Sequence, residues 1–587
     1  MNITSNFEKI TIKELLIFFI VAILAIQLLI FSSVYKVNFP YSTDWIGIMY
    51  FIDLVESGKI PYEEIFSSYN GHFIIIPRLL ALPNLIFNSY DVGNLFYFQW
   101  ILVCLTVIFY FLLLRNDKNL WWTLIPIAAF MFSPLPNSNY WSLAIFMWLI
   151  PPLCVVATTY LICKRKVNNR IFFLSTILAF VSTFSSTIGI VTWLVGLIGF
   201  GLGTELNSES RRKWFILWLL STLIAAVTYY FSVRRDEFTV NFPMMFSENG
   251  LIFFLNFIAV PFRVKYELPI ISIGIFTLLI SLISILYYFK FKNRMRPFLP
   301  WIIFIIIGLV DAIITGSGRI QLEQHGGNEP YYIPMAHFTQ IGAIVILSKI
   351  IIDIKKSKIF RFRSIIVIII CSIIVVNVLL LIPSYYIGWN RGEYYYNEKM
   401  EYLECFTLEH QDRCFDLLEP HDEERIRIHH LINYWIRNHL SIFSETKYSH
   451  QNNNLVDNFV KRIDLSKITQ IGIGGIENIN GEKPNLAEPM IINSPSIAID
   501  GEISTFDGQA LDEMYLIIDK KPFMKLNYIQ NDSDQSHITE NKFSSKWRVA
   551  FMTGYLEHGL HKIEIVGFKN NEFIELEQSV VISINKN

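Results

Sequence analysis

The residue best suited to take part directly in a reaction is Asp44, which lies in the run Tyr41-Ser-Thr-Asp-Trp45. A carboxylate placed beside an acceptor molecule can remove a proton from its hydroxyl group, as a general base does. Asp is also a preferred N-cap residue, and an amphipathic helix is expected to begin at Trp45. The two roles are compatible. Asp44 is therefore the candidate catalytic residue of the chain.

Arginine residues form a second group that could bind a substrate. Arg234 and Arg235 follow one apolar run, and Arg319 follows another. The planar guanidinium fork matches the oxygens of a phosphate, so these residues predict a site for a lipid phosphate or pyrophosphate. Ordinary phospholipid head groups would satisfy them as well, and so would nearby carboxylates. The carboxylates that offer such an alternative are Asp236, Glu237 and Glu267.

The segment 35–91 is expected to be the first outer loop and is far longer than the cytoplasmic loops; long loops in compact architectures are usually functional. It contains Asn70-Gly-His72 and, shortly afterwards, Pro77-Arg78. We predict that His72 and Arg78 contribute to a site for the substrate or its lipid phosphate.

A second polar loop, 316–332, is rich in glycine and contains Glu323, His325 and Tyr331. Glu323 and His325 can bind sugar hydroxyl groups or, together with Asp44, a divalent cation such as Mg²⁺ or Mn²⁺. Their spacing lacks the tight pattern of a transition-metal site, so no such site is expected. Tyr331 completes the candidate substrate-binding set.

The composition places these residues in a membrane protein. Of the 587 residues 53% are hydrophobic and only 17% are charged, and the mean hydropathy is +0.40. A soluble chain of this length is less apolar. Long apolar runs fill residues 12–386, whereas 387–587 has the composition of a soluble protein. The formal net charge of −1 gives no sign of a nucleic-acid partner. The apolar runs make the lipid bilayer the expected environment.

Eleven apolar runs are expected to cross a bilayer core of about 30 Å. They are 12–34, 92–114, 119–134, 142–163, 171–186, 188–204, 214–232, 270–289, 299–315, 334–353 and 364–386. Lys and Arg cluster between alternate runs, and the positive-inside rule makes those loops cytoplasmic, together with the amino terminus. The basic clusters fall at 115–118, 164–170, 211–213, 290–296 and 355–363. The count requires a turn at 185–187, and it requires 251–262 to be an interfacial or re-entrant piece on the outer face.

Asp311 is the one carboxylate that falls clearly inside an apolar run. Ionisable residues within membrane segments are candidates for function. Its place near the outer end of the run 299–315 is equally compatible with solvation at a helix end.

The last third of the chain is predicted to lie outside the cytoplasm, because eleven crossings carry it there. Residues 387–466 have a helical pattern and form a connector. Residues 467–587 show short alternating runs punctuated by Gly, Asn, Asp and Pro, which predict an all-β sandwich. In that compartment Cys405 and Cys414 are able to form a disulfide.

These features together resemble the GT-C superfamily of membrane glycosyltransferases, in which the first extracytoplasmic loop carries a catalytic acidic residue. Asp44 in Ser-Thr-Asp-Trp is the matching position. Three runs look more closely like a group of bacterial multipass proteins of surface-polysaccharide assembly, many of which end in an Ig-like β-sandwich. These runs are Asn70-Gly-His-Phe-Ile-Ile-Ile-Pro-Arg-Leu, Phe184-Ser-Ser-Thr-Ile-Gly-Ile-Val-Thr-Trp-Leu-Val-Gly, and Gly318-Arg319 through Tyr331.

The resemblance implies a multipass enzyme of the plasma membrane that transfers a sugar from a polyprenyl-phosphate donor. Arg234, Arg235 or Arg319 would hold the phosphate, and Asp44 would deprotonate the acceptor, a cell-surface glycan or a lipid-linked molecule. The single Asp of the acidic motif leaves a divalent cation as an optional cofactor. The β-sandwich would bind or orient the acceptor.

Three other functions are compatible with the sequence. A flippase or transporter of lipid-linked oligosaccharides would also need outer-facing arginines, although its charges should extend through the membrane midplane. A polysaccharide polymerase shares the substrates and the geometry. A structural or adhesion protein would act through residues 387–587 alone.

Overall fold

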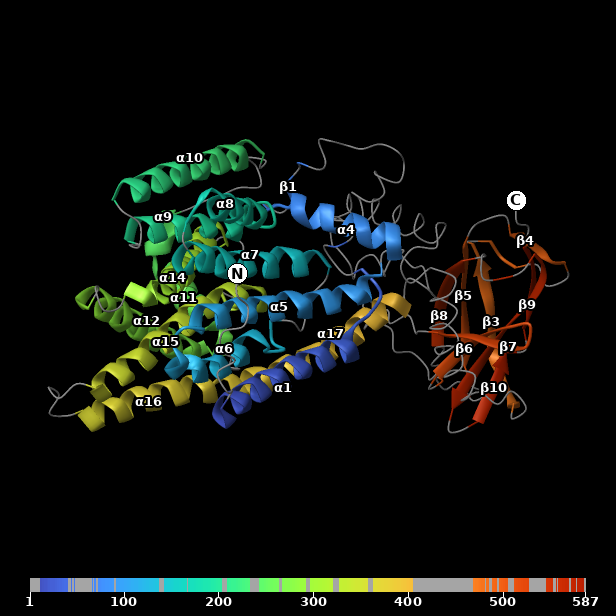
Figure 1. Ribbon diagram of the computed structural model, residues 1–587. Helices are drawn as coiled ribbons and strands as arrows, with labels where there is room; N and C mark the ends of the chain where they lie inside the picture. Colours follow the sequence, from blue (N-terminus) through green and yellow to red (C-terminus); the bar gives the residue numbers. More distant parts are fainter. Residues whose placement is uncertain are drawn as a thin grey trace. The chain divides into compact units, whose positions relative to one another are not determined.

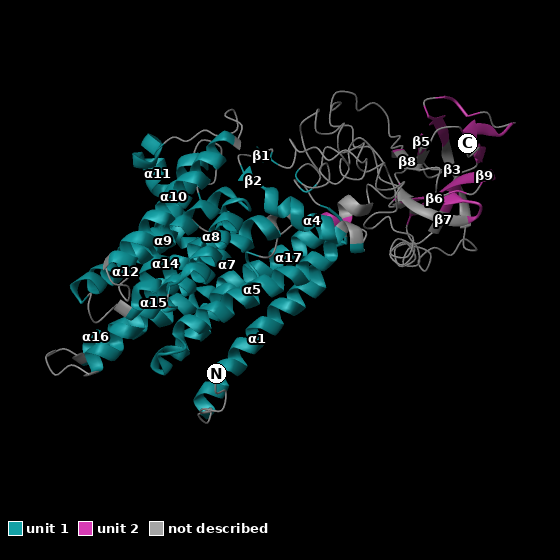
Figure 2. Cartoon of the chain, turned by 45° about the horizontal axis from the view of Figure 1, so that its top comes forward, with its two compact units in different colours: residues 1–397 teal, residues 398–587 magenta. Residues whose placement is uncertain are grey.

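The chain divides into two compact units, Met1–Asn397 and Glu398–Asn587, in the computed structural model (Figures 1 and 2). The structure describes residues 11–40, 44, 47, 66, 68–69, 72–88, 91–136, 142–165, 167–202, 208–232, 242–262, 267–291, 296–319, 327–356, 363–404, 468–480, 482–484, 488–492, 496–504, 511, 513–526, 545–552, 556, 558–569, 572–576 and 578–584.

Unit 1 is a bundle of helices with one short hairpin, β1 (Ser68–Tyr69) and β2 (His72–Phe73). Its α-helices are α1 (Ile12–Tyr35), α4 (Ile75–Asn88), α5 (Val92–Leu114), α6 (Leu124–Met131), α7 (Ser142–Lys164), α8 (Asn169–Thr183), α9 (Thr192–Leu202), α10 (Ser208–Ser232), α11 (Glu248–Ala259), α12 (Glu267–Lys290), α14 (Leu299–Arg319), α15 (Ile333–Lys356), α16 (Arg363–Leu379) and α17 (Leu381–Glu404). Its 3₁₀ turns are η2 (Lys118–Thr123), η3 (Thr187–Val191), η4 (Phe242–Phe246), η5 (Val260–Phe262), η6 (Arg296–Phe298) and η7 (Pro330–Tyr332).

The helices begin where a polar side chain caps the free backbone N–H groups. Thr11 accepts a hydrogen bond from the backbone N–H of Glu14, and the Glu14 carboxylate accepts one from the backbone N–H of Thr11, which forms a capping box at the start of α1. Asp91, Asn168 and Ser247 cap α5, α8 and α11 more simply, since each side chain accepts one hydrogen bond from a backbone N–H of the first turn. The boundaries of these apolar helices are therefore encoded by single polar residues.

Eight helical segments of the described chain, rather than the expected eleven, are long and apolar enough to cross a membrane. They are Ile12–Tyr35, Val92–Leu114, Ile145–Lys164, Glu209–Phe231, Ile270–Lys290, Leu299–Arg319, Pro330–Lys355 and Ser364–Met400. The expectation was wrong for 119–134, 171–186 and 188–204, because helices α6, α8 and α9 have only 8, 15 and 11 residues. At 1.5 Å per residue none of the three reaches about 30 Å.

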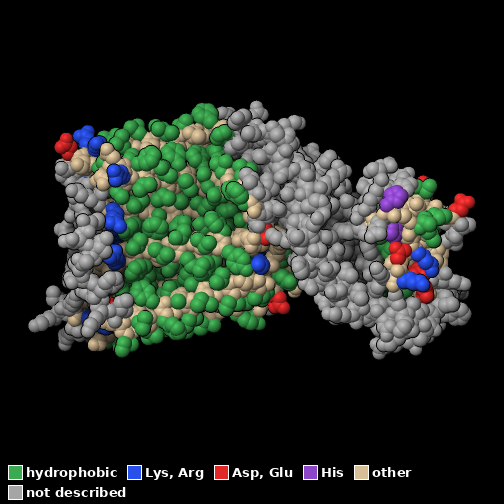
Figure 3. Space-filling view, turned by 45° about the vertical axis from the view of Figure 1, so that its right-hand side comes forward, with side chains coloured by type: hydrophobic (Ala, Val, Ile, Leu, Met, Phe, Trp, Pro, Cys, Tyr) green, Lys and Arg blue, Asp and Glu red, His purple; other side chains and the backbone are tan. Residues whose placement is uncertain are grey.

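The basic loops between the helices nevertheless gather at one end of unit 1. Lys118 forms an ion pair of 3.6 Å with Glu14, and Lys164 donates a hydrogen bond of 3.0 Å to the carbonyl oxygen of Pro297. Figure 3 shows Lys and Arg side chains along one edge of the hydrophobic surface of this unit. We call this edge the basic end. The predicted placement of all five basic clusters on one side of the membrane stays a prediction, since parts of these loops lie outside the described residues.

The segment expected to be interfacial or re-entrant forms the short helix α11 and the turn η5. Phe253, Phe257 and Phe262 in it are completely buried. The helix packs against α12, α14 and α15, so neighbouring helices cover it.

Unit 2 contains the expected strands. They are β3 (Ile468–Ile479), β4 (Met490–Ile492), β5 (Ser496–Ser504), β6 (Glu513–Ile518), β7 (Lys521–Leu526), β8 (Ser545–Met552), β9 (Gly559–Lys569), β10 (Glu572–Leu576) and β11 (Val580–Ile584). Their order is β4-β11-β9-β10-β3-β5-β8, with β6 paired to β9 and β7. The first of them begins at Ile468, as expected for a β region that starts near residue 467.

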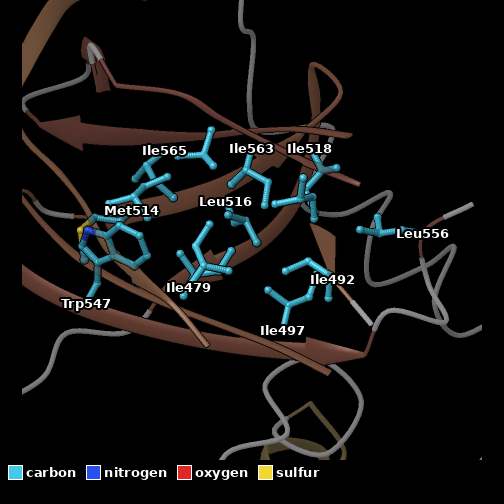
Figure 4. Close-up of a cluster of buried hydrophobic side chains, with 14 of the residues drawn as sticks. Ile479, Ile492, Ile497, Met514, Leu516, Ile518, Trp547, Leu556, Ile563 and Ile565 are labelled. Carbon is cyan, nitrogen blue, oxygen red and sulfur yellow. The ribbon is translucent and has the colours of Figure 1, made fainter. Parts of the chain in front are cut away.

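A single apolar core fills unit 2 (Figure 4). Ile479, Ile497 and Trp547 come from β3, β5 and β8, and they face Leu516 of β6 and Ile563 of β9. The register brings them together because alternate side chains of each strand point to the same side.

The boundary between the units differs from the expected one. Helix α17 continues without a break through residue 386, where the membrane part was expected to end, and the first unit extends to Asn397. Most of the predicted connector 387–466 lies outside the described residues, as do Cys405 and Cys414, so their predicted pairing stays a prediction.

Candidate functional site

The centre of the candidate site is a contact between two residues that lie 247 positions apart in the sequence. His72 is on β2 and Arg319 is the last residue of α14, and Nη2 of Arg319 lies 3.1 Å from Nε2 of His72. A guanidinium group has only donors, so Nε2 must accept this hydrogen bond.

The other ring nitrogen of His72 contacts the turn η3. Nδ1 lies 2.8 Å from Oγ1 of Thr187, 3.4 Å from the backbone nitrogen of Thr187 and 3.5 Å from Oγ of Ser186. Thr187 Oγ1 in turn lies 2.5 Å from the hydroxyl group of Tyr229 on α10. A chain of hydrogen bonds thus runs from Arg319 through His72 and Thr187 to Tyr229, and it fixes the orientation of the imidazole.

Burial keeps His72 uncharged. Its side chain is 7% exposed, and this burial, with a smaller contribution from the positive charge of Arg319, lowers the pKa of His72 from 6.5 to about 3. At neutral pH His72 is therefore a neutral hydrogen-bond acceptor that orients Arg319 without cancelling its charge.

Aromatic rings form one side of the site. The indole of Trp148 on α7 lies edge-on to the imidazole of His72, with ring centroids 5.9 Å apart, and it lies 5.1 Å from the ring of Tyr331. Tyr331 also contacts Tyr332 at 4.5 Å. These rings exclude water from one side of the imidazole and present flat apolar faces beside a cation.

Arg319 keeps most of its hydrogen-bonding capacity. It is half-buried, and in the described part of the chain its one hydrogen bond goes to His72 and it forms no ion pair. A guanidinium group has five donors, so at least four remain for a ligand. A cation held in place by a neutral residue is suited to bind an anion.

The local fold explains how His72 reaches this position. The hairpin β1–β2 pairs Tyr69 with His72, and the next residues begin α4. The backbone N–H of Ile76 donates a hydrogen bond of 3.0 Å to the carbonyl oxygen of Phe184, which ties this segment to the end of α8. Phe73 packs against Phe184 with ring centroids 5.2 Å apart.

A glycine allows η3 to approach α8 closely enough for Thr187 to meet His72. A Cβ atom at Gly189 would lie 1.9 Å from the carbonyl oxygen of Ser182. Only a residue without a side chain fits there, so the Ser-Ser-Thr-Ile-Gly run of the sequence has a structural reason.

Arg78 contacts Gly47, three positions after Asp44 in the first loop. The side chains of Arg78 and Asp44 are buried, Asp44 completely, and Nε of Arg78 donates a hydrogen bond of 3.4 Å to the carbonyl oxygen of Gly47. Six residues separate Arg78 from His72, so their Cα atoms are at most about 20 Å apart even for an extended chain. Arg319 does not contact Asp44. Asp44 is itself helical, which differs from the expected N-cap position.

The structure therefore brings His72 and Arg319 into contact, connects Tyr331 to His72 through Trp148, and places Arg78 next to the Asp44 segment. The predicted site residues Arg234, Arg235, Glu323 and His325 lie outside the described residues. Within the described ranges no group of three or more His, Cys, Asp or Glu residues is arranged to hold a metal ion.

Sequence reasoning missed three residues of the site: Trp148, Thr187 and Tyr229. Thr187 lies in the run 184–196 that carries the family resemblance, which was an available signal. Trp148 and Tyr229 occur within apolar runs, where aromatic residues usually serve packing alone.

The neutral state of His72 has a consequence for stability. Its pKa is near 3 in the folded protein and 6.5 in the unfolded one, so between these values the unfolded state binds more protons. Stability is then complete above about pH 6.5 and is lost as the pH falls toward 3. We expect the unfolding temperature of His72→Gln to fall less than that of the wild type over this range. Equal losses in thermal unfolding scans would contradict a buried neutral His72.

Comparison with protein-family models, with curated proteins and with solved structures found no match to this chain.

Proposed function

We propose that the chain is a membrane glycosyltransferase of the GT-C type, which moves a sugar from a polyprenyl-phosphate donor to a cell-surface glycan or a lipid-linked acceptor. The observation that carries the proposal is Arg319, an arginine at the end of a membrane-length helix, oriented by a neutral histidine and without an acidic partner in the described chain. A lipid-linked phosphate is the anion that such a position favours.

The position of Arg319 along α14 supports an outer-leaflet substrate. Helix α14 starts next to Pro297, which contacts Lys164 at the basic end, and its 21 residues span about 31 Å before Arg319. By the positive-inside rule the basic end is cytoplasmic, so Arg319 belongs to the outer head-group level. Residues 387–587 would then be extracytoplasmic, provided that the chain after α15 crosses the membrane back to the outer side.

In the proposed reaction Arg319 holds the donor phosphate and Asp44 accepts the proton of the acceptor hydroxyl. The acceptor oxygen forms a bond to the anomeric carbon, the bond from that carbon to the phosphate oxygen breaks, and the electron pair remains on the departing polyprenyl phosphate. Arg319 stabilises the charge that develops there. Because Asp44 is completely buried, the acceptor reaches it only when its surroundings rearrange.

Two other parts of the chain have supporting roles in this proposal. The rings of Trp148 and Tyr331 offer an apolar surface for the sugar or the first isoprene unit. Unit 2, proposed to be an Ig-like sandwich, would bind the acceptor glycan.

Lipid that copurifies with the protein tests the proposal. Mass spectrometry of the purified wild type should find polyprenyl phosphate or its sugar derivative, enriched over an unrelated multipass protein prepared from the same membranes. A lipid complement of ordinary phospholipids, identical in the two preparations, would remove the basis for the transferase.

A further inference from the structure

A second buried polar group lies on the same helix as Arg319. The side chain of Asp311 is completely buried, and among the described residues neither of its carboxylate oxygens has a partner in good hydrogen-bond geometry, although the hydroxyl group of Thr315 is its polar neighbour. One turn further along α14, the hydroxyl group of Thr315 is also buried and has no such partner. Burying a polar group without a hydrogen bond is costly, and burying an ionised carboxylate alone costs far more.

No charge in the described chain compensates Asp311, since the one polar side chain that acts on it is Thr315. The helices packed against α14 include α7, α11, α12 and α15. On α15, His337 contacts Phe130, and Lys349 pairs with Asp353 at 3.0 Å. The titratable residues of the other three helices are Cys154, Tyr160, Cys163 and Lys164 on α7, Glu248 on α11, and Glu267, Tyr287, Tyr288 and Lys290 on α12.

Between Asp311 and the basic end, helices α14 and α15 pack closely against each other. A Cβ atom at Gly308 would lie 2.2 Å from Oγ1 of Thr339 on α15, and one at Gly342 would lie 2.5 Å from the carbonyl oxygen of Trp301. The two helices therefore touch at backbone distance just below Asp311. In the other direction Asp311, Thr315 and Arg319 follow one another at spacings of four residues, over about 12 Å of helix.

We propose that Asp311 is a proton-binding site of the membrane unit, an uncharged carboxylic acid that exchanges its proton toward the Arg319 end of α14 by way of Thr315. A proton fits this site better than a metal cation does. Metal cations such as Ca²⁺ take several oxygen ligands, whereas the carboxylate here has one neighbouring hydroxyl group. The proposal is independent of sugar transfer.

An apolar carbodiimide distinguishes an uncharged buried acid from a carboxylate. Dicyclohexylcarbodiimide adds to the protonated carboxyl group: the acid proton moves to a nitrogen, the carboxyl oxygen bonds to the central carbon, and the adduct rearranges to a stable N-acylurea without a leaving group. The full-length protein in phosphatidylcholine vesicles should be labelled at Asp311, as peptide mass spectrometry detects. Labelling should fall as the pH is raised and the acid ionises.

Asp353 is the matched internal control, because it is equally enclosed but paired with Lys349. It should remain unlabelled while Asp311 reacts, and Asp311→Asn should lose the adduct. Three results would overturn the proposal: no adduct at Asp311 with an adduct at Asp353, labelling that does not change with pH, or protection of Asp311 by Na⁺ at constant ionic strength, which would indicate a metal cation. These readouts do not require activity, so failure of the transferase proposal would leave them unaffected.

Discussion

Replacing Asp44 by Asn should lower the rate of sugar transfer by about 10²- to 10⁴-fold, which is the usual contribution of a positioned general base. Asn has nearly the same shape as Asp, so the completely buried side chain is replaced without a cavity. It cannot accept the proton of the acceptor hydroxyl. The measurement is single-turnover transfer of a labelled sugar from polyprenyl phosphate in vesicles that contain the purified protein.

Two comparisons make the Asp44 result interpretable. Polyprenyl phosphate should copurify with Asp44→Asn in the same amount as with the wild type, because the phosphate site is separate. Asp117→Asn, a change of the same chemistry near the basic end, should transfer sugar at the wild-type rate. If Asp44→Asn also transfers at that rate, Asp44 is not the base.

Removal of Arg319 should have the second large effect. In Arg319→Ala the phosphate loses its oriented donors, so copurified polyprenyl phosphate should fall to background and transfer should slow by about 10²- to 10³-fold, as when one preorganised donor is removed. Arg319→Lys keeps the charge but loses the fork, and it should give an intermediate loss. The measurements are lipid mass spectrometry and the transfer assay.

The control for Arg319 is Arg212, an exposed arginine at the start of α10. Arg212→Ala removes the same charge from the basic end and should leave both lipid content and transfer unchanged. Thermal unfolding checks that Arg319→Ala still folds, which is expected because the residue makes one hydrogen bond. Undiminished polyprenyl phosphate in a folded Arg319→Ala protein would show that the phosphate binds elsewhere.

The helices show how far the sequence predicts this fold. Hydropathy correctly located α1, α5, α7, α10, α12, α14 and α15, because a long apolar segment that must satisfy its own backbone becomes a helix. It overestimated α8 and α9, since apolar residues buried against other helices have the same composition as those that face lipid. The length of a helix depends on where its caps and turns lie. Helix α8 already ends at Thr183, before the turn η3, although the apolar run continues to residue 186.

The sequence likewise predicted some residues of the candidate site and missed others. Residue type alone identified His72, Arg319 and Tyr331 as candidates, because exposed-loop polar residues and guanidinium forks have few structural uses. It could not identify Thr187, Tyr229 or Trp148 as their neighbours, since His72 and Thr187 are 115 positions apart. It also could not foresee that His72 is neutral, because the pKa depends on burial.

The sequence by itself determined that this protein has a membrane part followed by a β region, because solvent preference and backbone hydrogen bonding act locally along the chain. Only the tertiary structure decided which helices are long enough to span, which ring nitrogen of His72 faces Arg319, and that Asp311 is enclosed. Those facts depend on contacts between residues far apart in sequence, and such contacts follow from packing rather than from composition.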